Sequence, residues 1–150
     1  MKTILVAVDL SPVSPQVIKE ATTLAKGLSA HIVLLHVVPP VSSAVPVGSS
    51  MEMVSVPLPI SSEEITDIKK RLNALATPVE EAGVQVQTVV KEALPVEEIK
   101  HQTEAHHAGI LVVGSHGHGG LYHLFNGSVV TELLKQATKP VLVVPVSKKH

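Results

Sequence analysis

A glycine-rich segment has the clearest chemical potential in the sequence. Gly114-Ser115-His116-Gly117-His118-Gly119-Gly120 follows an apolar run, and Gly127-Ser128 precedes a second apolar run with helical spacing. Glycines let the backbone adopt positive φ and approach a ligand closely, so that successive N–H groups point at one anion. A helix N-terminus adds unpaired N–H donors, and the Ser128 hydroxyl adds one more. The segment Gly114–Ser128 therefore predicts an anion site that suits a phosphate chain.

Two familiar phosphate-binding motifs do not match this segment. A P-loop has lysine directly before its final Ser or Thr, whereas Gly127 precedes Ser128. The dinucleotide fingerprint belongs after the first strand, where this chain has Asp9-Leu10-Ser11-Pro12. The segment also contains neither Lys nor Arg, the charges that fast phosphoryl transfer requires. The sequence thus favours binding over catalysis, with slow ATP hydrolysis as an alternative.

Asp9 is the second candidate for the site. It follows the apolar run Thr3–Val8, and Gly114 follows the apolar run Ile110–Val113. In open parallel sheets, ligands bind beyond the carboxyl ends of the strands, where the strand order reverses. We therefore expect Asp9 and Gly114 to share a site. The alternative for Asp9 is a structural role as a turn or N-cap residue before the next helix.

Nine histidines form a third group of candidates, and six of them fall within one short stretch. These six are His101, His106, His107, His116, His118 and His123. Metal binding is one interpretation. We favour solvated histidines and no dedicated metal site, because His106 and His107 are adjacent on a predicted helix and point apart. His116 and His118, beside the expected phosphates, would make ligand affinity depend on pH.

Composition limits the remaining function classes. A net charge of −1 without a basic stripe argues against a duplex DNA partner. Tyr122 and Phe125 are the only aromatic residues, which argues against base stacking on single strands. The absence of cysteine excludes disulfides and thiolate zinc sites. Apolar runs stay well below the ~20 residues that cross a bilayer, and Ile4–Val8 is too short for a signal peptide. We expect a cytoplasmic protein with neither nucleic-acid nor membrane partners.

The chain alternates between strand and helix patterns. Continuous apolar runs predict strands at 3–8, 32–38, 110–113 and 141–144, and alternating apolar residues predict one at 84–90. Apolar residues at helical spacing predict helices at about 17–28, 61–83, 95–107 and 128–137, with Pro78 kinking or shortening the second. This order implies one α/β domain over residues 1–150, an open five-stranded parallel sheet with helices on both faces. Alternating polarity places 84–90 at a sheet edge.

Residues 39–60 interrupt this alternation. They contain five prolines, many Ser and Val, and a single charged residue, Glu52. A loop of this length inside a compact domain is usually functional or disordered. We expect a long loop insertion that packs on the domain or on a second copy, with a lid and a flexible insertion as alternatives.

Together these features resemble the ATP-binding subgroup of the universal stress protein family. The family signature is Gly, two residues, Gly, nine residues, Gly, then Ser or Thr, which matches Gly114, Gly117, Gly127 and Ser128. The opening Ile-Leu-Val-Ala-Val-Asp, the later Leu-Leu-His-Val and the closing Lys-Pro-Val-Leu-Val-Val-Pro extend the resemblance over nearly the whole chain. Two positions outside the signature depart from many members: Glu92 replaces Gly, and Gly109 replaces Asp.

The resemblance implies a Rossmann-like fold of the adenine nucleotide alpha hydrolase type and a nucleotide-dependent regulatory module in stress response, not an enzyme. It implies ATP as the ligand, with AMP or ADP as alternatives and Mg²⁺ accompanying ATP. It places Asp9 near the adenosine, Val37 at the adenine through its backbone, and the signature residues at the phosphates. The full implied set is Ala7, Val8, Asp9, Val37, Val113, Gly114, His116, Gly117, Gly127, Ser128 and Val129.

The resemblance also implies a homodimer. The expected interface is the apolar edge strand formed by Val141, Leu142, Val143 and Val144. A nucleotide-independent interaction module is the remaining functional class, and the retained glycines count against it.

Overall fold

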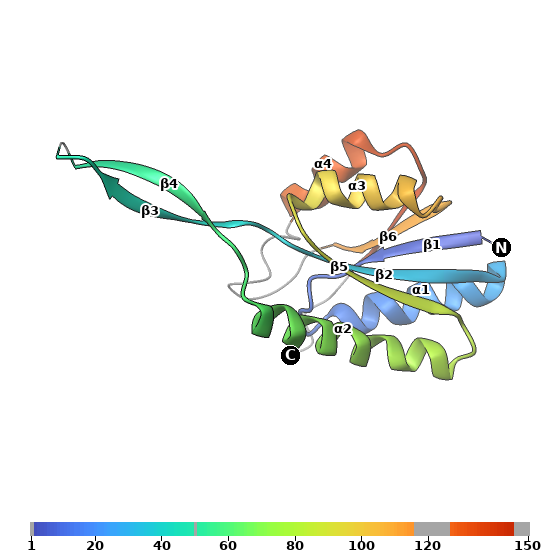
Figure 1. Cartoon of the computed structure of the whole chain (residues 1–150). Helices are drawn as coiled ribbons and strands as arrows, with labels where there is room; N and C mark the ends of the chain where they lie inside the picture. Colours follow the sequence, from blue (N-terminus) through green and yellow to red (C-terminus); the bar gives the residue numbers. More distant parts are fainter. Residues whose placement is uncertain (1, 50, 116–126, 146–150) are drawn as a thin grey trace.

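The computed structural model describes residues 2–49, 51–115 and 127–145, and the side chains of 127 and 128 are not described. Five strands form one parallel sheet in the order β5-β2-β1-β6-β7 (Figure 1). These strands are β1 (Lys2–Ala7), β2 (Ala30–Val38), β5 (Val86–Glu92), β6 (Ile110–Gly114) and β7 (Val141–Val144). The helices are α1 (Ser14–Leu28), α2 (Ser62–Glu81), α3 (Pro95–Ala105) and α4 (Gly127–Gln136).

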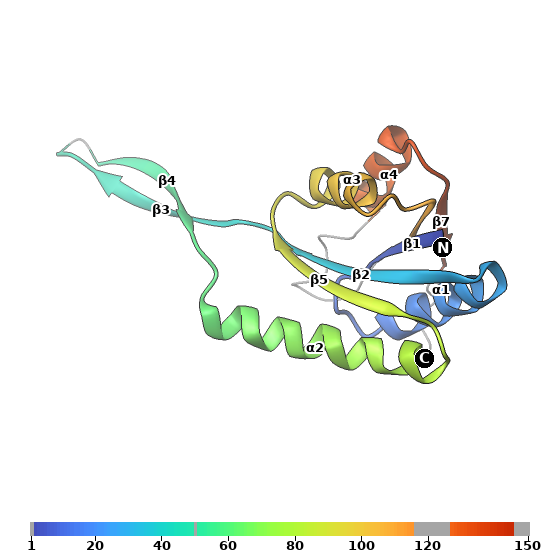
Figure 2. The ribbon, with the colours of Figure 1, turned by 45° about the vertical axis from the view of Figure 1, so that its right-hand side comes forward.

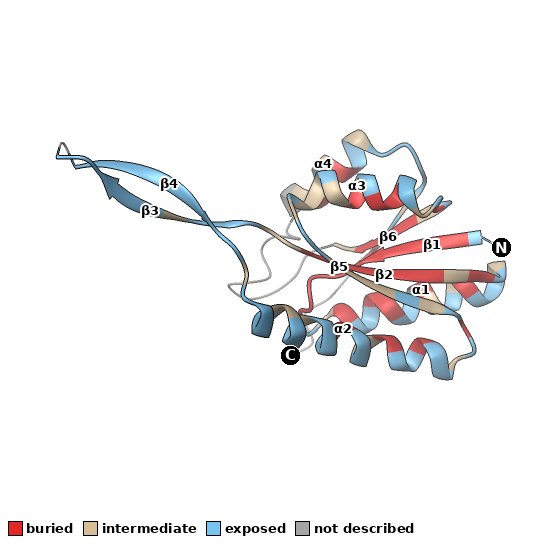
Figure 3. Cartoon of the chain, in the orientation of Figure 1, coloured by how far each residue is buried: buried red, intermediate tan, exposed pale blue. Residues whose placement is uncertain are grey.

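Helices cover both faces of the sheet. Helices α1 and α2 lie on one side, and α3 and α4 lie on the other (Figures 1 and 2). Successive strand residues face opposite sides, so Ile4 and Val6 pack toward α1 and α2, while Leu5 and Ala7 join the core beneath α3 and α4. Because β1 and β2 are buried on both faces, most of their residues are apolar (Figure 3). The expected open five-stranded α/β sheet is confirmed.

The order of the strands reverses at β1. The chain moves outward from β1 to β2 and β5, then returns to β6 on the other side and moves outward to β7. The switch point therefore lies between the carboxyl ends of β1 and β6. Asp9 lies just after β1, and Gly114 is the last residue of β6. Strands β5 and β7 form the two edges, as predicted for both.

Helix α2 begins as its sequence predicts. Ser61 is the N-cap, and its Oγ accepts a hydrogen bond from the Glu64 backbone N–H at 3.1 Å. Of the two outcomes predicted for Pro78, a kink or a shortened helix, the shortened helix is wrong, because α2 continues to Glu81. A proline removes one N–H from the ladder, and burial of Ala76 and Val79 against the sheet holds the last turn.

Residues 39–60 form a β-hairpin and not a loop, which corrects the sequence-based expectation. Strands β3 (Val41–Val47) and β4 (Glu52–Leu58) pair antiparallel, and Gly48 and Met51 adopt positive φ at the tip. This arm (residues 41–58) extends away from the domain and does not pack on it (Figures 1 and 2). Prolines concealed the strands, because a proline within an alternating pattern normally argues against a strand.

Candidate functional site

The carboxyl ends of β1 and β6 meet at one small hollow. Ala7, Val8, Asp9 and Gly114 line it, together with residues from the start of α1. Val113 is fully buried beside them and pairs with Ala7 across the two strands. The structure thus brings together five of the residues that the resemblance implies, from two segments that are far apart in the sequence.

Asp9 braces the turn that leaves β1. Its Oδ1 accepts hydrogen bonds from the Ser11 backbone N–H at 2.9 Å and from the Ser14 hydroxyl at 3.3 Å. Between them, Leu10 has a φ of 62°, in the left-handed region that non-glycine residues seldom occupy. Such a backbone costs about 1–3 kcal/mol and is concentrated at functional sites. The N-cap of α1 is Val13, so Asp9 holds the turn and does not cap the helix.

A larger cleft of about 500 Å³ adjoins this turn. Its walls come from the ends of β1, β2 and β5, the base of the arm, and the first turns of α2. Asp9 lines both the cleft and the hollow, so the two form neighbouring parts of one site. The volume lies within the range of roughly 300–1,000 Å³ that is typical of small-molecule sites.

His36 is a cleft residue that sequence reasoning did not select. It lies on β2, and its Nδ1–H donates to the Val8 carbonyl at 2.8 Å. Burial lowers the pKa of His36 below its ordinary value, and the nearby Arg71 charge acts in the same direction. The hydrogen bond to Val8 and the Asp9 charge oppose this shift without reversing it. The imidazole is therefore neutral at neutral pH. The available signal was a histidine among the buried apolar residues near the carboxyl end of β2.

Arg71 also reaches the cleft, from the middle of α2. Its Nη2 donates to the Leu10 carbonyl at 3.3 Å, so it contacts the residue with left-handed backbone. The contact places a cation in the same cleft as the Asp9 carboxylate. Nothing in the local sequence pattern of α2 distinguishes Arg71 from the solvent-facing lysines beside it.

The other implied residues lie outside the cleft wall or outside the described residues. Val37 is fully buried in the core beneath α3 and α4, so its side chain points away from the cleft that its neighbours His36 and Val38 line. Gly127 and Ser128 open α4, and Val129 packs against the same core as Val37. His116 and Gly117, like His118 and His123, lie outside the described residues.

Histidines and acids do not gather into a metal site in the part of the chain that the structure describes. There, His106, the C-cap of α3, donates from Nε2 to Gln102 Oε1 at 3.1 Å, one turn back in that helix. Across residues 2–49, 51–115 and 127–145, no helix has the length and apolar composition to cross a membrane.

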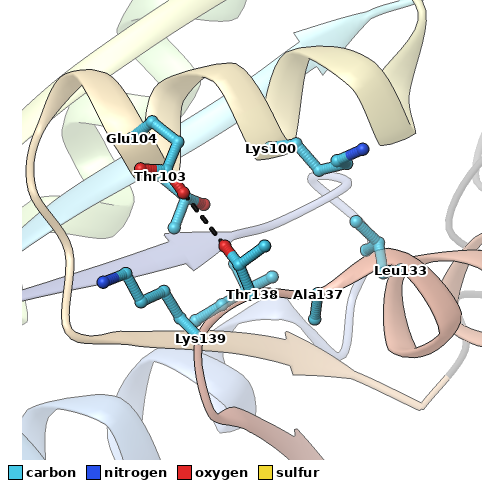
Figure 4. Close-up of a pocket in the computed structure, with 8 residues that line it drawn as sticks. Lys100, Thr103, Glu104, Leu133, Ala137, Thr138 and Lys139 are labelled. Carbon is cyan, nitrogen blue, oxygen red and sulfur yellow. Dashed lines mark hydrogen bonds between the residues drawn. The ribbon is translucent and has the colours of Figure 1, made fainter.

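A second pocket lies between α3 and α4 and has a volume of about 70 Å³ (Figure 4). Thr138 donates to Glu104 at 3.0 Å beside it, and the amines of Lys100 and Lys139 point in opposite directions. Leu111 in its wall lies near the start of β6, at the opposite end of the strand from Gly114. The pocket is small, its cations do not converge, and it lies away from the switch point.

Comparison with known proteins gives a consistent result. The model of the universal stress protein family matches residues 1–145. Universal stress protein MJ0531 of Methanocaldococcus jannaschii is 35% identical over 151 residues, covering 99% of this chain and 85% of that protein. Universal stress protein YxiE of Bacillus subtilis is 33% identical over 144 residues, covering 93% and 96%.

Two solved structures share the fold. A universal stress protein in complex with cAMP superposes with a TM-score of 0.71 at 18% identity, covering 97% of this chain and 98% of that one. The universal stress protein from Archaeoglobus fulgidus in complex with dAMP superposes with a TM-score of 0.70 at 20% identity, covering 96% and 98%.

Proposed function

Because the chain belongs to the universal stress protein family, we propose that it binds an adenine nucleotide, with ATP as the preferred ligand, at the carboxyl ends of β1, β2 and β6. The observation that carries this proposal is that Asp9 and Gly114, which are far apart in the sequence, line one hollow at the switch point of the sheet. Two proteins that share the fold were solved with cAMP and dAMP, both of them adenine nucleotides, which supports the same class of ligand here.

The geometry supports a division of the ligand between two parts of the site. The cleft offers apolar surface from Leu10 and Val38 and a neutral imidazole from His36, which suits an uncharged base and its sugar. The phosphates would lie toward Gly114 and the N-terminus of α4, which begins at Gly127. That helix N-terminus favours negative charge through its unpaired N–H groups and its dipole.

Mg²⁺ would accompany ATP through the phosphates and not through a protein cage. Asp9 Oδ1 already accepts two hydrogen bonds, and the described residues offer no cluster of three ligands. Such an arrangement is usual for Mg²⁺, which keeps several waters and bridges phosphate oxygens.

We propose a regulatory binding module acting in the stress response in the cytoplasm, not an enzyme. Phosphoryl transfer needs a positioned cation against the transferred group. The segment Gly114–Ser128 contains no Lys or Arg, and Arg71 is engaged with the Leu10 carbonyl. Slow ATP hydrolysis is the second candidate, favoured only by the phosphate-binding signature.

We also propose a homodimer through β7. This strand forms one edge of the sheet, its four residues are all apolar, and Leu142 is 39% exposed. An apolar edge with unpaired backbone groups readily accepts the edge of another chain.

The nucleotide proposal is tested first by identifying what the purified protein carries. Mass spectrometry of the released ligand, with calorimetric titration of ATP, ADP, AMP and GTP into stripped protein, separates the alternatives. We expect adenine nucleotides to bind at least about tenfold more tightly than GTP. Absence of measurable binding by any adenine nucleotide would refute the proposal.

A further inference from the structure

The arm has one strongly apolar face. In an antiparallel pair, residues directly opposite each other share a face of the sheet. The register pairs Val41 with Leu58, Ser43 with Val56, Val45 with Val54, and Val47 with Glu52. Six aliphatic side chains therefore lie on the same side of the hairpin. We call this the apolar arm face, formed by Val41, Val45, Val47, Val54, Val56 and Leu58.

These six side chains are all exposed to solvent, and Val41 and Leu58 at the base of the arm also line the cleft. Their exposed fractions run from 36% at Val45 to 60% at Val41, and Figure 3 shows the arm as exposed along almost its whole length. A two-stranded hairpin is marginally stable in water unless a hydrophobic face is covered. Contact with another molecule that buries the apolar arm face would therefore stabilise the hairpin, because the domain itself leaves this face exposed.

The edges of the arm are protected while its face is not. Pro46 and Pro57 each lie within a strand, opposite Met53 and Ser42 respectively. A proline has no N–H and fits a ladder only where its nitrogen points outward, so each removes a donor from one outer edge of the hairpin. A partner therefore meets the face of the arm and does not extend its edges.

We propose that the apolar arm face docks against the same face of a second copy of this chain, forming a two-layer β-sandwich between two arms. Stacked sheets of this kind lie about 10 Å apart and interleave their apolar side chains. The contact would be isologous, with each arm contributing the same six residues. It is separate from the β7 edge, since β7 and the arm's parent strand β2 have β1 and β6 between them in the sheet.

The charges on the arm favour a second copy over other occupants. Glu52 is the single charged residue of the arm and lies at its tip, opposite Val47. In an antiparallel stack, each Glu52 would lie over the base of the other arm, about 20 Å from its counterpart. The two Glu52 carboxylates would therefore not repel each other when two copies of the apolar arm face stack. A membrane or nucleic acid would instead be met by Lys or Arg, and the arm contains neither.

The arm contact can be tested in full-length protein that carries Leu142→Lys, which removes the β7 contact from the measurement. Six half-exposed aliphatic side chains bury less than the roughly 800 Å² per partner of a standard interface, so we expect a dimer in the micromolar range. Sedimentation equilibrium from about 1 to 200 µM covers that range. A monomeric Leu142→Lys protein throughout it would overturn the proposal.

Two further substitutions, each added to the Leu142→Lys protein, locate the contact. Val54→Lys places a cation at the centre of the apolar arm face, and Ser55→Lys places the same charge on the opposite face of the same strand. We expect Val54→Lys to weaken association by at least about 100-fold and Ser55→Lys by less than about threefold. Equal effects of the two, or a dimer that survives Val54→Lys, would overturn the proposal.

A cysteine pair gives an independent measure, because the chain has no cysteine of its own. With a bis-maleimide crosslinker that spans about 10 Å, the spacing of stacked sheets, Val54→Cys should form crosslinked dimers at least about tenfold faster than Ser55→Cys. Equal rates would contradict a face-to-face arm contact. Flotation with phosphatidylglycerol and phosphatidylcholine vesicles completes the test. If the protein is monomeric, floats with the vesicles and loses this binding on Val54→Lys, the partner of the apolar arm face is a membrane, and the proposal of a second copy is overturned.

Discussion

His36 Nδ1 donates a hydrogen bond to the Val8 carbonyl at 2.8 Å, joining β2 to the end of β1 directly beside Asp9. The bond orients the imidazole at the cleft and requires a proton on Nδ1. Because burial lowers the pKa of His36, the folded protein keeps the ring neutral over a pH range in which an unfolded chain would protonate it. The geometry of the site and the pH response of the fold are therefore connected through one side chain.

This link predicts a loss of stability on acidification. The unfolded chain binds more protons than the folded chain between the lowered folded pKa and the ordinary value of about 6.5, so the free energy of unfolding falls as pH drops through that range. His36→Asn retains a donor for Val8 and does not titrate. Urea unfolding at several pH values should show a steeper decline for the wild type between about pH 7 and 5. Parallel curves would contradict this assignment.

Asp9 should act on both the turn and the ligand. Asp9→Ala removes the acceptor for Ser11 and Ser14 and should lower the free energy of unfolding by about 1–3 kcal/mol. Asp9→Asn keeps an oxygen acceptor and should cost less than about 1 kcal/mol. Both should weaken ATP binding about tenfold or more in calorimetry. Unchanged affinity in Asp9→Ala would leave Asp9 with a structural role alone.

Glycine substitutions test the phosphate end of the site. Gly117→Val or Gly127→Val should abolish measurable ATP binding, because a side chain would fill the space that the phosphates need. Gly27→Val is the matched control, since a Cβ at Gly27 in α1 meets no atom within 4 Å. Calorimetry should show wild-type affinity for the control. If both Gly117→Val and Gly127→Val kept wild-type affinity for ATP, the phosphates would not bind at these glycines.

Hydrolysis should be slow. With no Lys or Arg between Gly114 and Ser128, we expect multiple-turnover phosphate release below about 1 s⁻¹, the lower end of common enzyme turnover. A coupled phosphate assay with saturating ATP and Mg²⁺ measures it. Faster turnover would favour the enzyme alternative over the regulatory module.

The cap of α2 should contribute measurably to stability. Ser61→Ala removes the acceptor for the Glu64 N–H and should lower the free energy of unfolding by about 1 kcal/mol. Ser62→Ala, one residue further along the same helix, is the control and should change it by less than about 0.5 kcal/mol. Equal effects in thermal or urea unfolding would contradict the capping role.

Local patterns were enough to predict the parallel sheet, its two edge strands and the start of α2. Each of these depends on neighbours in the chain: continuous apolar runs for β1 and β2, alternation for β5, and a Ser-x-x-Glu box at Ser61. Part of the site could be predicted for the same reason. Parallel strands bring their carboxyl ends to one edge of the sheet, and Asp9 follows β1 while Gly114 ends β6, so both line one hollow.

The arm shows where local patterns fail. Pro46 and Pro57 disguise two strands as a loop, and no short-range rule states whether a Val-rich hairpin packs on its own domain. Only the folded chain reveals that six aliphatic side chains lie on one outward face.

The residue types and spacings of this chain were sufficient for its family, its α/β sheet and the phosphate-binding signature, because these depend on periodicity and on glycines at set intervals. Only the tertiary structure placed His36 and Arg71 around the Asp9 turn and showed that the Val37 side chain lies in the core. The physical reason is that hydrogen bonds such as Arg71 to Leu10 join residues far apart in the chain, and their geometry arises only when the helices pack onto the sheet.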